Sequence, residues 1–156
     1  MGTSIKGWAR WVGPAALALA LHGCGSDPTA PQLTNGSITA QIDGGSFSAT
    51  TIVAAYTSGI MSIAGTDGQG RTIGIAGQIP GPGTYTVGVT SPANFSVNIA
   101  SAAWQAAITL GSGSVTVSSI SAAGAKGTFQ FTAAPLSGTT ATGTKVVTAG
   151  AFDVKF

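Results

Sequence analysis

The sequence contains very little charge. Asp, Glu, Lys and Arg together make up 6% of its 156 residues, and all 4 acidic residues are Asp. The formal net charge of +2 comes from Lys6 and Arg10 in the first segment, because basic and acidic residues balance in the rest of the chain. A nucleic-acid-binding domain needs clustered Lys and Arg to contact phosphates. No such cluster is present, so we expect no nucleic-acid partner.

The residues that carry most acid–base and metal chemistry are also nearly absent. The chain has one His, His22, one Cys, Cys24, and no Glu. A His-based triad, a Cys–His pair and a His-containing zinc site are therefore excluded after the first segment. A Ser–Lys or Asp–Asp arrangement is left open, and its candidates are Asp43, Asp67, Asp153, Lys126 and Lys145. No local motif supports it, so we expect no enzyme, no catalytic residue, no bound metal and no cofactor.

The first 23 residues have the composition of an export signal. Lys6 and Arg10 precede an apolar run from Trp11 to Leu21, which is shorter than the roughly 20 residues of a membrane-spanning helix. The run ends in Leu21-His22-Gly23-Cys24, which resembles the lipobox of bacterial lipoproteins, although His22 stands where a small or neutral residue is usual. We therefore expect residues 1–23 to be a lipoprotein signal peptide.

The lipobox resemblance implies that Cys24 is the site of lipidation, with a diacylglyceryl group on its thiol and an acyl group on the new amino terminus. Each buried methylene adds about 0.8 kcal/mol, so two or three chains anchor a protein effectively permanently. We expect the membrane to be a partner through this lipid, and the protein to lie in the bacterial cell envelope. Gly25 and Ser26 follow Cys24 in place of the Asp of inner-membrane retention signals, which favours the outer membrane. The periplasmic and the surface face are both left open.

The mature chain divides into a tether and one domain. Residues 24–36 are rich in Gly, Ser, Pro, Thr and Asn without periodicity, which predicts a flexible tether after the lipidated Cys24. Residues 37–156 have the size of a single domain, which can bury a core without disulfides or a metal. We predict one all-β domain over this range.

Alternation of apolar and polar residues is the dominant pattern of that domain. Such alternation is typical of antiparallel strands that are buried on one face. It predicts strands at Ile38–Ile42, Ile60–Gly65, Arg71–Ile79, Thr84–Val89, Phe95–Ile99, Gly113–Ile120, Thr128–Ala133 and Phe152–Phe156. Turn formers such as Asp43-Gly44-Gly45 separate the strands. We therefore predict a single antiparallel β-sandwich or a small closed barrel of about 8–10 short strands.

Ala100–Leu110 fits two kinds of element. Its alanines would line up on one face of a helix, whereas Trp104, Ala106, Ile108 and Leu110 also alternate as in a strand. We favour the strand and leave the helix open.

Four segments together resemble an uncharacterised all-β domain family of bacterial lipoproteins. They are Ile38 to Ala49, Gly83-Thr84-Tyr85, Gly127 to Phe131, and Gly150 to Phe156. Phe47 stands where such proteins often carry Trp. The resemblance implies the fold and a lipoprotein context without an activity. In its Gly-Thr-aromatic motifs, Gly can follow a tight turn and the aromatic side chain can enter the core.

Four residues are candidates for ligand binding. Trp104 and Tyr56 present an indole and a phenol that could stack on a sugar ring. Asp67-Gly68-Gln69-Gly70-Arg71 could supply oxygen ligands to calcium, with Asp43 as a second carboxylate. The further acidic ligands of an EF-hand-like loop are missing, so an ordinary turn is the simpler interpretation of the Asp67 segment.

Two hypotheses of function follow. The leading one is a membrane-anchored lipoprotein whose non-catalytic β domain is an interaction or structural module of the cell envelope, with an envelope protein or a glycan as partner. The alternative is a carbohydrate- or calcium-binding module centred on Trp104 and Tyr56, or on Asp43 and Asp67.

Overall fold

The computed structural model describes residues 32–33, 35–88 and 93–156, and this part of the chain is all β, with no helix. Its strands are β1 (Gln32–Leu33), β2 (Gly36–Ile42), β3 (Gly45–Ser48), β4 (Thr51–Thr57), β5 (Ile60–Thr66), β6 (Arg71–Gln78), β7 (Gly83–Thr86), β8 (Asn94–Ile99), β9 (Ala102–Ala106), β10 (Ser112–Ser121), β11 (Gly124–Pro135) and β12 (Lys145–Lys155). In the described ranges we find no helix that is long and apolar enough to cross a membrane.

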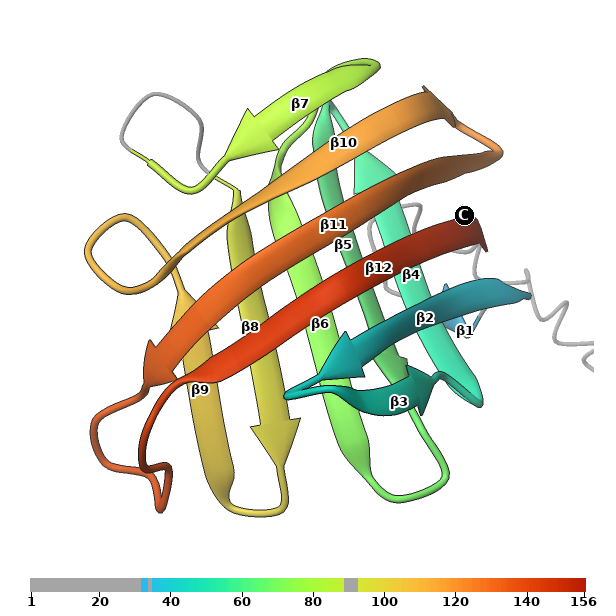
Figure 1. The fold of residues 1–156 in the computed structure, drawn as a ribbon. Helices are drawn as coiled ribbons and strands as arrows, with labels where there is room; N and C mark the ends of the chain where they lie inside the picture. The colour runs from blue at the N-terminus through green and yellow to red at the C-terminus, as the bar shows by residue number, and fades with distance from the viewer. Residues whose placement is uncertain (1–31, 34, 89–92) are drawn as a thin grey trace, which may run out of the picture.

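The strands form one curled antiparallel sheet with two halves. The back half has the order β1-β4-β5-β6-β8-β9, and the front half has the order β7-β10-β11-β12-β2-β3. In Figure 1 the front half crosses in front of the back half. The last residues of β11 join the two, because Ala134 and Pro135 pair with Gln105 and Trp104 of β9. The curled sheet thus brings its own two inner faces together.

The core lies between the inner faces of the two halves. One continuous buried cluster contains residues from both, and the rings of Phe95 on β8 and Phe131 on β11 stack with centroids 4.9 Å apart. Gly65 of the back half lies so close to Ile38 of the front half that a Cβ at Gly65 would be 3.1 Å from the Ile38 side chain. Burying a side chain of this size stabilises a fold by about 1.5–3 kcal/mol. The apolar positions of the alternating pattern therefore hold the halves together.

Glycine and phenylalanine face each other across neighbouring strands of the front half. The pairs in register are Gly113 with Phe131, Gly127 with Phe152, and Gly150 with Phe129. A Cβ at Gly150 would lie 2.5 Å from the Phe129 ring, so the missing side chain leaves the space that the ring occupies. In the Gly-Thr-aromatic motifs, Gly83 begins β7 as predicted, but Gly127 lies inside β11. The role of Gly127 is close packing and not a turn.

The predicted strands are confirmed, and the structure adds others. Each alternating segment named above overlaps one strand, and the segment left open between strand and helix contains β9. The described residues form a 12-stranded sheet instead of the expected 8–10 strands. Pattern reasoning missed β4, because its outward residues Val53 and Ala55 are apolar and remove the alternation. It also missed the short β3 and β1, and β1 lies inside the range expected to be a tether.

Candidate functional site

The outer face of the front half carries hydroxyl and amide groups in two rows. The first row is Thr84, Thr116, Thr128, Ala151, Thr39 and Ser48, which follow one another in register from β7 to β3. The second row is Thr86, Ser114, Gln130, Thr148, Gln41 and Ser46. All are exposed except Ser114, which is partly exposed. We call these two rows the hydroxyl face.

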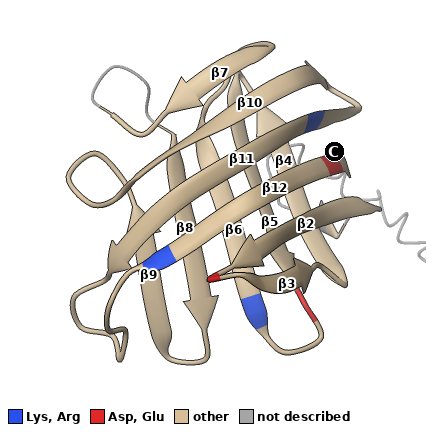
Figure 2. Ribbon diagram, in the orientation of Figure 1, with Lys and Arg blue, Asp and Glu red and all other residues tan. Residues whose placement is uncertain are grey.

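Charged residues of the front half lie only at the two ends of the hydroxyl face, in the part of the chain that the structure describes (Figure 2). At one end Lys126 pairs with Asp153, with 2.8 Å between the ammonium nitrogen and the carboxylate. Lys155 lies at the same end of β12. At the other end Lys145 pairs with Asp43 at 2.6 Å. The face between these ends is uncharged.

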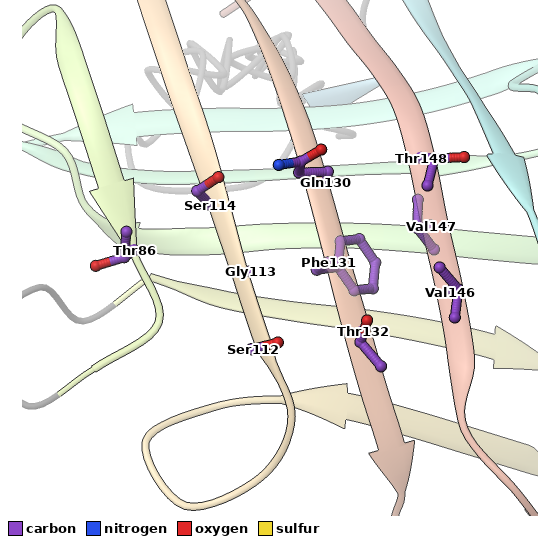
Figure 3. A pocket seen from close by; sticks show the side chains of 10 residues that line it. All are labelled: Thr86, Ser112, Gly113, Ser114, Gln130, Phe131, Thr132, Val146, Val147 and Thr148. Carbon is purple, nitrogen blue, oxygen red and sulfur yellow. The ribbon is translucent and has the colours of Figure 1, made fainter.

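Two adjoining hollows lie on the hydroxyl face. The first has a volume of about 340 Å³, and Figure 3 shows its outward side chains on β10, β11 and β12, among them Ser112, Thr132 and Val146. The second has a volume of about 430 Å³ and continues along the same strands toward Thr116 and Thr128. Both hollows are lined by Ser114 and Gln130, so together they form a groove that follows β11.

An irregularity in β12 shapes the second hollow. The register of β12 shifts against β2 between Thr148 and Ala151, and Ala149 has a φ of 49°. A positive φ is uncommon for a residue other than glycine and marks a local distortion of the strand. Ala149, Gly150 and Ala151 line the hollow at this point. The small side chains leave the groove open beside β11.

Trp104 is held inside the protein. Its side chain is buried, with 6% of the residue exposed, and the indole Nε1 donates a hydrogen bond of 3.0 Å to the carbonyl oxygen of Gly143. The ammonium of Lys145 lies 5.1 Å from the ring centroid, within the range of a cation–π contact. The indole N–H and one ring face are therefore already engaged by the segment that leads into β12.

Lys145 connects Asp43 with Trp104, because its ammonium contacts both side chains. One carboxylate oxygen of Asp43 accepts a hydrogen bond of 2.6 Å from Lys145 Nζ, and the other accepts one of 2.9 Å from the amide of Val146. These hydrogen bonds, that from Lys145 above all, lower the pKa of Asp43. The structure thus joins two candidates that the sequence had assigned to different ligands.

Asp67 connects the two halves of the sheet through Arg71. The Asp67 carboxylate accepts hydrogen bonds from the amides of Gln69 and Arg71, each 2.9 Å long, and one of 2.7 Å from Arg71 Nε. Arg71 Nη2 donates to the Ser46 carbonyl oxygen at 2.6 Å, and the guanidinium lies 5.8 Å from the centroid of the Phe47 ring on β3. Both carboxylate oxygens proposed as calcium ligands are therefore hydrogen-bonded within the protein.

Burial and hydrogen bonding act in opposite directions on Asp67. Burial raises its pKa, because it disfavours the charged carboxylate, but the hydrogen bonds from Arg71 and Gln69 outweigh this and the pKa is lowered. Asp67 and Asp43 lie in the turns after β5 and β2, respectively. In the described ranges no three His, Cys, Asp or Glu residues gather in a group that could hold a metal ion.

Tyr56 lies apart from Trp104. It is on β4, and β5, β6 and β8 separate that strand from β9 in the sheet order. Its ring stacks on Phe156 with centroids 5.5 Å apart, and its hydroxyl donates to the Pro80 carbonyl oxygen at 3.4 Å. Tyr56 thus packs the back half against the end of the chain, and the two aromatic candidates do not form one platform.

The remaining candidates are either in ion pairs or outside the residues that the structure describes. Lys126 and Lys145, considered as bases, pair with Asp153 and Asp43. Cys24 and residues 1–23, the segment predicted to be a signal peptide, lie outside the described residues. Sequence reasoning named no residue of the hydroxyl face as a candidate, although repeated Thr and Ser favour a sheet whose outer face is hydroxylated and uncharged. Its signal, Thr, Ser and Gln at the outward positions of alternating strands, was present, but only the register shows that these positions form rows.

The family comparison covers nearly all of the described domain. Residues 34–153 match the model of a domain of unknown function (DUF6252). No curated protein and no solved structure matches the chain. The family match agrees with the resemblance to an uncharacterised domain family, and it extends from the residues before β2 into the last strand, β12. The chain therefore belongs to the family of this domain of unknown function (DUF6252).

Proposed function

We propose that this protein is a non-catalytic interaction module of the bacterial cell envelope, anchored in the membrane, most simply the outer membrane, by lipid on Cys24. The observation that carries the proposal is the hydroxyl face, which is exposed, uncharged and hollowed along β11. Exposed polar groups on a rigid sheet can bind a partner without catalysing a reaction. The acids and lysines considered for catalysis are paired with one another or with Arg71, which supports a binding role.

We further propose that the curled sheet acts as a β-sandwich and not as a closed barrel. The sheet order runs from β1 to β3 without a ladder that joins these two ends in the described ranges. The two halves contact each other through side chains such as Tyr56 and Phe156 on that side. In this arrangement the hydroxyl face is the outer surface of one layer, which leaves the whole face accessible.

Site-specific photo-crosslinking of the full-length protein in its native cells tests the binding role. A photoreactive residue at Thr128 would report on the hydroxyl face, and one at Ser62, exposed on the outer face of β5, would be the matched control. We expect crosslinks to an envelope component from position 128 and not from position 62. Equal crosslinking from both positions, or none from 128, would contradict the proposal.

The anchor is tested with the same protein. Mass spectrometry of the mature N-terminus is expected to show acyl groups on Cys24, and Cys24→Ala is expected to release the protein from the membrane fraction. Crosslinks from position 128 should then be lost, because the domain no longer stays beside its partner. An unmodified Cys24 in the membrane-bound protein would refute the lipoprotein assignment.

A further inference from the structure

We infer that the hydroxyl face binds a neutral, hydroxyl-rich polysaccharide chain that lies along the groove on β10, β11 and β12. This inference rests on the proposed function and names the chemical class of the envelope component. It differs from the sequence-based carbohydrate hypothesis, which placed the sugar on Trp104 and Tyr56. Both of those rings pack against other parts of the protein.

The first argument is the charge of the surface. No charged side chain lies in the two rows, and two of the lysines that flank them, Lys126 and Lys145, are in ion pairs with Asp153 and Asp43. A phosphorylated or acidic polymer requires Lys or Arg to compensate its charge, and a basic partner requires carboxylates. An uncharged ligand requires neither. The face is complementary to a neutral chain.

The second argument is the kind of polar group. Ser and Thr hydroxyls and Gln amides both donate and accept hydrogen bonds, which is also true of sugar hydroxyls. The binding energy of protein interfaces is concentrated in buried aromatic and Arg side chains, and Met is also enriched there. Among the residues that the structure describes, the exposed large apolar residue beside the groove is Val146; the others, Leu33, Ile60, Ile108 and Leu136, lie outside the strands of the front half. The composition favours a glycan over a protein surface or a lipid.

The third argument is the shape and rigidity of the groove. The two hollows share Ser114 and Gln130, so the depression is elongated along β11 and suits a chain more than a single small molecule. Its groups stand on paired strands, and the hydroxyl of Thr116, which lines the second hollow, is 2.9 Å from that of the neighbouring Thr84 in a cross-strand hydrogen bond. Groups that are already ordered lose little entropy when a ligand binds.

The test measures binding of the full-length protein in detergent micelles to insoluble neutral polysaccharides, namely a β-1,4-glucan, a β-1,3-glucan and an α-1,4-glucan. An anionic polysaccharide, alginate in gel beads, is the comparison. We expect retention by at least one neutral polymer that is insensitive to salt. Retention by alginate alone that weakens with salt would overturn the inference, because it would show an electrostatic partner.

A matched pair of double variants locates the binding surface. Thr84→Val with Thr116→Val removes two hydrogen-bonded hydroxyls from the hydroxyl face. Thr66→Val with Thr72→Val removes a similar pair, 2.8 Å apart, from the outer face of the back half. We expect about tenfold weaker binding for the first variant and no change for the second, since each lost hydrogen bond contributes a few-fold in affinity. Equal binding by both would overturn the inference.

A steric variant tests the same surface without relying on the loss of hydroxyl groups. Ala151 lies in the first row between Thr128 and Thr39, so Ala151→Arg would place a long charged side chain across the groove. Binding should fall more than tenfold, whereas Ser62→Arg on the back half should leave it unchanged. Circular dichroism checks that both variants are folded. Unchanged binding by folded Ala151→Arg would overturn the inference.

The two proposals fail in different ways. If crosslinks from position 128 persist while no neutral polysaccharide binds or competes with them, the hydroxyl face is an interaction surface but its ligand is not a neutral glycan. If position 128 gives no crosslinks in cells, the proposed function itself is wrong.

Discussion

The two halves of the sheet bury the same kind of core but present different outer faces. In the front half the outward positions carry Thr, Ser and Gln, as in the row from Thr84 to Thr128. In the back half a polar row, Thr51, Thr66, Thr72 and Asn98, lies beside a row of smaller and partly apolar residues, Val53, Ala64, Gly74 and Ser96. The core requires one apolar face on each strand, and it leaves the opposite face free to vary. The difference between the outer faces therefore reports on function more than on folding.

The largest loss of stability is expected from removing the Phe131 ring, because it packs against Phe95 between the two halves. Phe131→Ala deletes the partner of Phe95 and leaves a cavity between the halves, so we expect a loss of about 3–5 kcal/mol in the free energy of unfolding. Urea unfolding followed by circular dichroism measures it. Val146→Ala, at an exposed position of the same half, should change stability by less than about 0.5 kcal/mol. Similar losses for the two variants would contradict the assigned core.

Replacing glycine by alanine should have different effects on the inner face of the front half, at Gly127, and on the outer face of the back half, at Gly74. A Cβ at Gly127 would lie 2.3 Å from the Thr116 carbonyl oxygen and 2.7 Å from the Phe152 ring, so Gly127→Ala should cost about 1–3 kcal/mol. At Gly74 the new Cβ would meet the Ser96 hydroxyl at 2.6 Å, and that side chain can rotate away. Gly74→Ala should therefore be nearly neutral. Thermal unfolding of both variants makes the comparison, and a neutral Gly127→Ala would disprove the close packing.

The link between the halves at Asp67 should matter more than the ion pair on the front half. Asp67→Asn removes the charge that holds Arg71, whose guanidinium also contacts the Ser46 carbonyl oxygen, and should cost about 1–3 kcal/mol. Asp153→Asn removes the exposed pair with Lys126 and should cost no more than about 1 kcal/mol. Urea denaturation at neutral pH measures both. A larger loss of stability for Asp153→Asn than for Asp67→Asn would contradict the expectation that the Asp67 link matters more.

Acid should weaken the interactions of the Asp67 and Asp43 carboxylates. The pKa values of Asp67 and Asp43 are lowered by folding, so the unfolded chain binds protons first as the pH falls. The stability from these carboxylates is complete above the ordinary Asp pKa of about 3.9. It should be lost progressively as the pH falls through that value toward the lower folded-state pKa. The urea midpoint of Asp67→Asn should fall less than that of the wild type, and parallel curves would show that Asp67 contributes nothing.

Sequence reasoning predicted the strands well where the outer face is polar. The alternation at Ile38–Ile42 is a local property of the chain and predicts β2 directly. It failed at β4, because the outward Val53 and Ala55 are as apolar as the inward residues. The candidate ligands Trp104 and Asp43 were chosen for their side-chain chemistry. Their partner Lys145 is distant in sequence from both, so a local pattern did not show that they are already engaged.

The sequence by itself determined the all-β class, most strands, the small number of charges and the expectation of a lipidated Cys24. These follow from composition and from the period of two along the chain, which are local properties. Only the tertiary structure decided the register that aligns Thr84 with Thr116 and Ala151 with Thr39, because each of these pairs joins strands that are far apart in the sequence. It also decided that the two halves face each other and that the charges pair at the ends of the hydroxyl face. Pairing between distant strands depends on the packing of the whole core, so no local pattern contains it.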